Sequence, residues 1–339
     1  MERNGVLHGY KDKTILITGG AGCIGANLVH ALLPIGPKKI VVLDDYSSSF
    51  PWNLPKHSLL EVVEGSILDE QKLKQVFYNK PDFVIHLAAH FANQNSIDHP
   101  ESDLMINGLG LLKVLEYSRL TNPDRFIFAG SGCSVYGSHA ELPFCEGSVS
   151  LTLDTPYQIH KLLGELYCNH YLEIYGLPTT IGRFFNVFGP GEVPGRYRNV
   201  IPNFMWLAMH DRSLTITGTG DETRDFAYVG DIVDGILKMG VIDKAIGQDM
   251  NLASGTETSV KDLASLVVKI SKSKGGITFA DKRAWDKSNR RLASIDKAKE
   301  LIGYEPKMEF EEGLKNVFNW LKENKENIIK SVGPSADLW

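Results

Sequence analysis

Two residues near the middle of the chain have the types and spacing for joint acid–base chemistry. The stretch "TPYQIHKLLGE" (155–165) places Tyr157 and Lys161 four positions apart in a segment with a helical pattern. Residues at i and i+4 project from the same helix face, so both side chains can reach one cleft. A phenol ionises near pH 10, and a neighbouring ammonium favours its ionised form. The pair is therefore a candidate general acid/base, although the same spacing is also typical of an amphipathic helix with a solvated lysine.

A glycine-rich turn upstream favours the catalytic interpretation. The strand-like "TILITG" (14–19) runs into "AGCIGANLVHALL", so Gly19, Gly22 and Gly25 stand at the start of a predicted helix. Glycines allow a tight turn and a close approach of the backbone to a pyrophosphate, which the helix N-terminus attracts. The next predicted strand ends in "VVLDDYSSS". There Asp44 can accept hydrogen bonds from both ribose hydroxyls of an adenosine, and with Asp45 it would repel a 2′-phosphate. The pattern favours NAD over NADP; the alternative is an ordinary turn with an acidic pair at the surface.

These motifs depend on a regular succession of elements. Apolar, β-branched runs alternate with helical patterns, which is typical of a parallel sheet covered by helices on both faces. We therefore predict an α/β fold, with a Rossmann-type doubly wound sheet over 1–185 and a smaller C-terminal α/β substrate-binding region over 186–339 that exchanges segments with it. The predicted strands are 14–19, 39–44, 59–65, 82–89, 125–131 and 178–184, and the predicted helices are 23–33, 69–79, 101–120, 156–175, 199–210, 230–241, 258–272 and 311–324.

The composition argues against several kinds of binding partner. The 339 residues carry a formal net charge of −5, and the basic residues form no stripe that would follow a nucleic acid backbone. The polar N-terminus and the absence of a long apolar run predict no membrane span and a cytoplasmic protein. The four cysteines lie far apart without a C-x-x-C pair, so neither disulfides nor a metal site are expected.

Taken in order, the motifs resemble those of the extended short-chain dehydrogenase/reductases, and specifically the NAD-dependent nucleotide-sugar epimerases and dehydratases of the UDP-glucose 4-epimerase type. The resemblance runs through "TGGAGCIG", "LDDYSSS", "HLAAH", "NGLGLLKVLE", "SVYG", "PYQIHK", "RFFNVFGPG", "TRDFAYVGDI" and "KAKELIGYEPK", which span nearly the whole chain. It implies an enzyme that binds NAD and a nucleoside-diphosphate sugar. It also implies a homodimer formed through the helices at 101–120 and 156–175.

The resemblance also implies roles for individual residues. Tyr157 would be the acid/base, Lys161 would hold the nicotinamide ribose and lower the tyrosine pKa, and Arg224 and Arg283 would clamp phosphates. For His90 and Asn93 an ordinary loop role is an equal alternative. The implied cofactor-binding residues are Gly19, Gly22, Cys23, Ile24, Gly25, Asp44, Asp45, Ser47, Ser66, Ile67, Leu87, Ala88, Ala89, Asn107, Tyr157, Lys161 and Phe184, and the implied substrate-binding residues are His90, Asn93, Asn186, Asn199, Arg224 and Arg283.

The loop "FAGSGCSVYG" departs from the family pattern. Gly132 stands where relatives carry a serine or threonine that contacts the substrate hydroxyl and the tyrosine, so Ser131, Cys133 or Ser134 would have to replace it. Relatives that eliminate water or decarboxylate carry an acidic residue just before "VYG", and this chain has none there. Inversion at C4 is therefore the favoured reaction. The alternatives are a 4,6-dehydratase or other 4-keto-forming enzyme, and a non-catalytic NAD-binding protein.

Overall fold

The predicted Rossmann-type sheet is confirmed. The structure is a computed structural model that describes residues 8–138, 140–283 and 286–333, and in that part of the chain seven parallel strands form the main sheet in the order β3-β2-β1-β4-β5-β6-β9. The order reverses between β1 and β4, where doubly wound sheets bind their ligands. The strands are β1 (Thr14–Thr18), β2 (Lys39–Asp44), β3 (Leu60–Glu64), β4 (Phe83–His86), β5 (Arg125–Ser131), β6 (Thr179–Phe184) and β9 (Asp249–Leu252).

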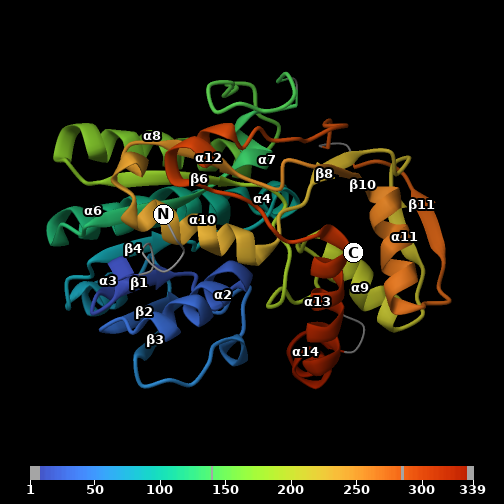
Figure 1. Cartoon of the computed structure of the whole chain (residues 1–339), viewed down its shortest axis with the longest axis horizontal. Coiled ribbons are helices and arrows are strands. Elements are labelled where there is room, and N and C mark those ends of the chain that lie inside the picture. Colours follow the sequence, from blue (N-terminus) through green and yellow to red (C-terminus); the bar gives the residue numbers. More distant parts are fainter. Residues whose placement is uncertain (1–7, 139, 284–285, 334–339) are drawn as a thin grey trace.

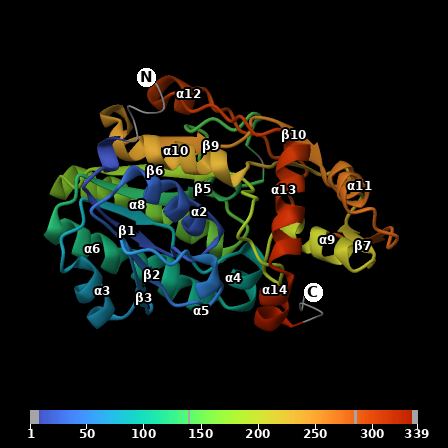
Figure 2. The ribbon, with the colours of Figure 1, turned by 60° about the horizontal axis from the view of Figure 1, so that its bottom comes forward.

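Helices cover both faces of this sheet. Alternate residues of β1 point to opposite faces, so Ile15 and Ile17 join one hydrophobic core while Leu16 joins the other. Figures 1 and 2 show α10 beside α2 on one face and α8 beside α6 on the other. The first face carries α2 (Cys23–Leu32), α10 (Val229–Val241) and α12 (Asp296–Ile302), and the second carries α3 (Glu70–Phe77), α6 (Leu111–Thr121) and α8 (Pro156–Tyr175).

The helix predicted over 101–120 is interrupted. It begins as α5 (Pro100–Asp103), continues as the π-helix η4 (Leu104–Gly110) and only then becomes α6. Gly108 and Gly110 lie in the π-helical turn, and a methyl group on Gly110 would come within 2.5 Å of Ile67. The short helices α4 (Asn93–Asp98) and α7 (Gly132–Val135) lie outside the predicted elements, as do the turns η1 (His8–Tyr10), η3 (Pro51–Asn53) and η5 (Asp243–Ala245). The turn η2 (Leu33–Ile35) begins at the last residue of the predicted helix 23–33.

The remaining elements gather at one end of the main sheet (Figure 1) and enclose a core of their own. Phe204, Trp206 and Leu263 are fully or almost fully buried in it. The strand β8 pairs with β10 and β7 pairs with β11. These elements are α9 (Val200–Met209), α11 (Val260–Ser271), α13 (Phe310–Glu323), α14 (Lys325–Val332), β7 (Leu214–Thr217), β8 (Thr223–Asp225), β10 (Glu257–Ser259) and β11 (Ile277–Ala280).

Two kinds of feature are missing from the described residues. None of their helices is both long and apolar enough to cross a bilayer. No three or more of their His, Cys, Asp and Glu side chains are grouped so that they could hold a metal ion.

Candidate active site

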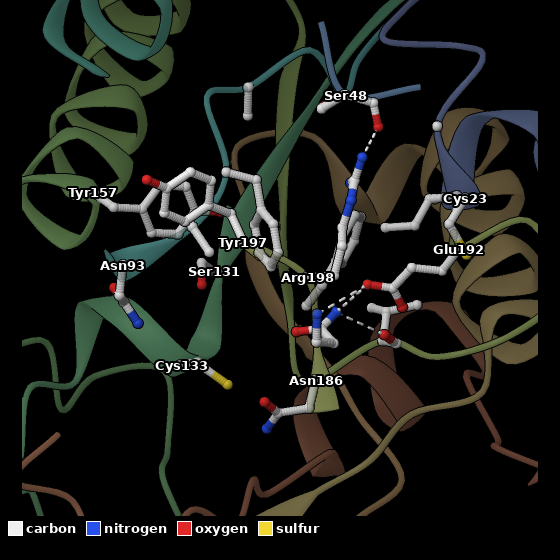
Figure 3. A pocket seen from close by; sticks show the side chains of 18 of the residues that line it. Cys23, Ser48, Asn93, Ser131, Cys133, Tyr157, Asn186, Glu192, Tyr197 and Arg198 are labelled. Carbon is white, nitrogen blue, oxygen red and sulfur yellow. Dashed lines mark hydrogen bonds between the residues drawn. The ribbon is translucent and has the colours of Figure 1, made fainter. Parts of the chain in front are cut away.

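A cavity of about 490 Å³ opens at the carboxyl ends of the parallel strands. Its walls come from the turn after β1, the loops after β2, β4, β5 and β6, the start of α8, strand β8 and the residues Lys282, Arg283, Asp286 and Arg291. Figure 3 shows Tyr157, Ser131 and Cys133 on one side of this cavity and Cys23, Glu192 and Arg198 on the opposite side. The volume is in the range of sites for small organic ligands.

The turn after β1 forms a cradle that only glycine permits. Gly19 has φ +71°, and a Cβ there would lie 2.6 Å from the backbone nitrogen of Ala88. A Cβ on Gly25 would lie 2.5 Å from the Cα atom of Gly20, so this glycine allows α2 to pack closely on the turn. The helix begins at Cys23, and the N–H groups of its first turn have no partner within the helix. The cradle therefore fits the pyrophosphate of a dinucleotide.

The acidic pair after β2 borders the same cavity. The Asp44 carboxylate is buried and accepts hydrogen bonds from the Ala21 backbone N–H at 2.8 Å and the Ser49 hydroxyl at 2.6 Å. The Asp45 carboxylate accepts from the Ser47 hydroxyl at 2.6 Å. Since the glycine turn donates directly to Asp44, the carboxylate has a fixed position beside the pyrophosphate cradle, as the predicted ribose contact requires.

Fifteen of the predicted cofactor-binding residues line the cavity, and two do not. The Ser66 hydroxyl accepts from the Leu68 backbone N–H at 3.2 Å and stabilises its own turn. Asn107 is buried, donates to the Asp103 carboxylate at 2.8 Å and exchanges hydrogen bonds with the backbone of His90. Asn107 therefore positions the loop after β4. The residues that line the cavity are Gly19, Gly22, Cys23, Ile24, Gly25, Asp44, Asp45, Ser47, Ile67, Leu87, Ala88, Ala89, Tyr157, Lys161 and Phe184.

Tyr157 and Lys161 enter the cavity from the first turns of α8. Thr155 caps this helix by accepting from the Gln158 N–H at 3.4 Å, and Pro156 occupies its first position. The Lys161 ammonium lies 5.5 Å from the centre of the Tyr157 ring and donates to the Ala129 carbonyl at 2.9 Å. The same cleft thus receives both side chains, as the i, i+4 spacing predicts.

Burial dominates the electrostatics of the pair. Burial raises the pKa of Tyr157 well above its ordinary value, and the neighbouring Asp103 and Cys133 raise it further. Burial lowers the pKa of Lys161 to about 8. Loss of solvation is the largest cause of the raised tyrosine pKa. That Lys161 lowers this pKa stays a prediction for the protein with bound NAD⁺.

The loop after β5 explains why glycine occupies position 132. A Cβ there would lie 1.8 Å from the Phe185 ring, so no serine or threonine fits without displacing that ring. The Ser134 hydroxyl is buried and donates to the Ser131 hydroxyl at 2.8 Å, which leaves the Ser131 proton free for another acceptor. Cys133 also lines the cavity. All three predicted substitutes line the cavity, and Ser131 is the one whose hydroxyl accepts from a neighbour and keeps its own proton for a ligand.

The six predicted substrate-binding residues also line the cavity. Asn93 accepts from the Thr155 hydroxyl at 2.8 Å, so it joins the loop after β4 to the start of α8. Asn186 donates to the Asp225 carbonyl at 3.3 Å, and Asn199 donates to the Glu192 carboxylate at 2.9 Å. The others are His90, which is half-buried, Arg224, which pairs with Asp286 at 2.8 Å, and Arg283, which is exposed at the rim.

Among the charged residues in the cavity that sequence reasoning missed, two are buried. Glu192 is 6% exposed, burial raises its pKa to about 7, and its Oε2 atom has no hydrogen-bond partner. Arg291 is 5% exposed and donates to the Cys133 carbonyl. Neither belongs to a motif that the sequence displays, since each is an ordinary charged residue in a loop. Their burial depends on segments distant in the chain.

Several hydrogen bonds join the two sides of the cofactor cradle. Asn53 donates to the Gly191 carbonyl at 2.8 Å, and Asn27 donates to the Pro190 carbonyl at 2.7 Å. The Arg198 guanidinium donates to the Ser48 carbonyl (Figure 3). The loop after β2 and the segment after β6 are thus braced against each other.

Comparison with known proteins agrees with this geometry. Residues 15–253 match the model of the NAD dependent epimerase/dehydratase family. The chain belongs to this family. It is similar to an epimerase structure from Methanothermobacter thermautotrophicus, with 50% identity, a TM-score of 0.96 and coverage of 97% of this chain and 98% of the other. It is also similar to the UDP-glucose 4-epimerase of Thermotoga maritima solved with UDP-glucose, with 31% identity, a TM-score of 0.87 and coverage of 92% and 99%.

Curated relatives of the family catalyse more than one reaction. The UDP-glucose 4-epimerase of Mycolicibacterium smegmatis is 31% identical over 316 residues, which cover 92% of this chain and 99% of the relative. A UDP-N-acetyl-alpha-D-glucosaminuronate decarboxylase of Bacillus cytotoxicus and a dTDP-D-glucose 4,6-dehydratase of Bos taurus are similar to the chain at 30% and 29% identity. The chain is therefore an enzyme of the nucleotide-sugar epimerase and dehydratase group.

NAD is the cofactor of this family, and the residues present fit it. The glycine cradle at Gly19 and Gly25 leaves space that a Cβ would fill, and the first turn of α2 presents free N–H groups beside it. The fixed carboxylate of Asp44 stands where an adenosine ribose needs an acceptor.

Proposed function

We propose that the protein is an NAD-dependent nucleotide-sugar 4-epimerase. The observation that carries the proposal is the placement of Tyr157, Lys161 and Ser131 on the walls of the cavity that also contains the dinucleotide cradle. The loop 131–135 carries no carboxylate, and an elimination across C5 and C6 needs an acid and a base beside the sugar. Similarity to UDP-glucose 4-epimerases supports the same reaction.

The chain's own groups would act on the hydroxyl at C4. Tyr157 would take its proton as the carbonyl forms and return it after the sugar has turned. The Ser131 hydroxyl, oriented by Ser134, would donate a hydrogen bond to the same oxygen. Lys161 would hold a ribose hydroxyl of the cofactor, and Arg224 and Arg283 would hold the diphosphate. Bound NAD⁺ supplies the hydride acceptor and a positive charge that favours the tyrosinate.

The reaction is tested by incubating the NAD-loaded protein with UDP-, GDP-, CDP- and dTDP-hexoses. We expect a pair of C4 epimers to form from at least one of them, without a stable keto product. Accumulation of a 4-keto-6-deoxy sugar would show a dehydratase instead. Turnover of none of these compounds, combined with retained NAD, would favour a non-catalytic protein.

Replacement of Tyr157 by phenylalanine separates catalysis from folding. The variant should keep NAD and lose turnover by about 10²-fold or more, the contribution of a positioned acid/base group. Tyr78→Phe is a matched control, since that side chain is 85% exposed, and its turnover should equal that of the wild type. Retention of activity in Tyr157→Phe would contradict the proposed role.

We propose that a second copy of the chain covers the outer face of α8 and η4. These two elements pack against each other, and Leu104, Met105, Ile159, Leu166 and Ile174 on them are between 42 and 64% exposed. Such an apolar face is typical of an interface. Light scattering should give twice the chain mass of 37.6 kDa. The Ile159→Glu and Leu166→Glu double variant should give a single chain, and a monomeric wild type would refute the homodimer.

A further inference from the structure

Arg291 is a buried cation at the catalytic end of the cavity. Its side chain is 5% exposed, lines the cavity and donates from Nη1 to the Cys133 backbone carbonyl. Cys133 lies between the two serines of the loop after β5, and it is close enough to Tyr157 to affect the tyrosine pKa. Arg291 therefore lies beside the position where the reacting sugar carbon must sit.

The backbone around Arg291 is held in place from two directions. Phe144 donates to the Leu292 carbonyl at 2.8 Å and accepts from Ser294 at 3.0 Å. The Ala293 N–H donates to the buried Asp225 carboxylate at 3.3 Å. Asp225 belongs to β8, the strand that also carries Arg224. The Arg291 side chain therefore extends into the cavity from a rigid support, whereas Arg283 lies exposed at the rim.

The charges around Arg291 do not balance within the protein. Among the described residues, no carboxylate comes within 4.0 Å of its guanidinium. Arg224 pairs with Asp286 at 2.8 Å. Asp154 is close enough to Arg291 for their charges to attract, but its direct partners are Lys287 at 3.2 Å and the Ser138 hydroxyl at 2.5 Å. Arg224 is also close enough to Arg291 for their charges to repel. A buried cation of this kind normally has an anionic partner, because leaving it unpaired is costly.

We infer that Arg291 binds an anionic substituent on the sugar itself, namely the carboxylate of a hexuronic acid. The inference rests on the proposed function, because it names the class of sugar that this site would epimerise. A guanidinium presents parallel N–H donors that match the two oxygens of a carboxylate. The diphosphate is the other possible source of negative charge. Because Arg291 contacts the Cys133 carbonyl, it lies at the loop after β5, which would hold the sugar, and we therefore assign it to the sugar and not to the diphosphate.

The test measures binding to the NAD-loaded Tyr157→Phe protein, which cannot turn its ligands over. Calorimetry compares UDP, UDP-glucose and UDP-glucuronate, which share the same diphosphate. UDP-glucuronate should bind about 10- to 100-fold more tightly than UDP-glucose, as expected for a hydrogen-bonded charge pair. Equal binding of the two sugars would overturn the inference, and this comparison needs no change at position 291.

Three variants test whether Arg291 is the source of this preference. Arg291→Gln should remove the preference for UDP-glucuronate while leaving UDP and UDP-glucose within about twofold, and Arg291→Lys should restore part of it. Arg283→Gln is the matched loss of charge at the predicted diphosphate contact, and it should weaken all three ligands alike. If Arg291→Gln also weakens all three equally, Arg291 belongs to the diphosphate site and the inference is wrong. If UDP itself does not bind, the same comparison is made with the nucleoside diphosphate whose hexose the protein turns over, and failure of UDP, GDP, CDP and dTDP alike to bind would instead contradict the proposed function.

Discussion

Replacing Glu192 by glutamine should make the protein more stable at alkaline pH. Burial raises the pKa of this carboxyl from 4.5 to about 7, and Arg198 and Asn199 only partly oppose the shift. The folded state therefore holds the proton more tightly than the unfolded state does. The group stabilises the fold at low pH, and this contribution is lost as the pH rises from about 4.5 through about 7.

The magnitude follows from the two pKa values. A tenfold difference in proton affinity is worth about 1.4 kcal/mol, so the ionised Glu192 costs about 3 kcal/mol of folding free energy at pH 8. Glutamine keeps an oxygen that can accept from Asn199, as Oε1 of Glu192 does at 2.9 Å, and it carries no charge. The free energy of unfolding of the variant should thus equal that of the wild type near pH 4.5 and exceed it by a growing amount as the pH rises above that value.

Urea unfolding of both proteins across pH 4.5 to 8.5 measures this difference. Other titrating groups cancel because only the difference between variant and wild type is compared. Glu305→Gln, at an exposed loop position, is the control, and its free energy of unfolding should differ from that of the wild type by nearly the same amount at every pH. A difference for Glu192→Gln that does not change with pH would refute the reasoning.

Three further variants test other parts of the structure. Gly132→Ala should lower the free energy of unfolding by about 1 to 3 kcal/mol in urea, because its Cβ would meet the Phe185 ring, and an unchanged stability would contradict the packing described. Arg183→Met should cost about 3 to 5 kcal/mol in the same assay, since it leaves Glu165 buried without its partner at 2.7 Å; a cost below 1 kcal/mol would be evidence against a buried pair. Asp44→Ala should weaken NAD binding about 10- to 100-fold in a fluorescence titration, and unchanged binding would remove Asp44 from the ribose site.

The sequence predicts most of the sheet because parallel strands are buried on both faces and display continuous apolar runs. All six predicted strands are present within three residues at each end. The seventh, β9, has only four residues and contains Asp249 and Asn251, so its apolar signal is weak. The π-helix at 104–110 has apolar residues at helical spacing, so the local pattern does not distinguish it from an α-helix, although Gly108 and Gly110 are weak helix formers.

In the candidate site, too, some residues could be predicted from a local pattern and others could not. Residues in motifs, such as Gly19 and Tyr157, could be placed because local geometry requires those residue types at those positions. Glu192 and Arg291 could not, because only the contact of distant segments buries them. Burial of the phenol, which raises the Tyr157 pKa, could not be predicted for a related reason: spacing in the sequence reveals the neighbouring lysine but not the loss of solvent around the ring.

The braces between the loop after β2 and the segment after β6 bear on how the protein would keep its cofactor. The Asn53 contact with Gly191 spans 138 positions of the chain, and the Arg198 contact with Ser48 spans 150. The residues of both contacts line the cavity, so we expect the contacts to slow release of a bound dinucleotide. An enzyme that regenerates NAD⁺ within every catalytic cycle has no need for exchange. For the proposed 4-epimerase we therefore expect the dinucleotide to stay bound through successive turnovers, independently of the NAD⁺/NADH ratio around the protein.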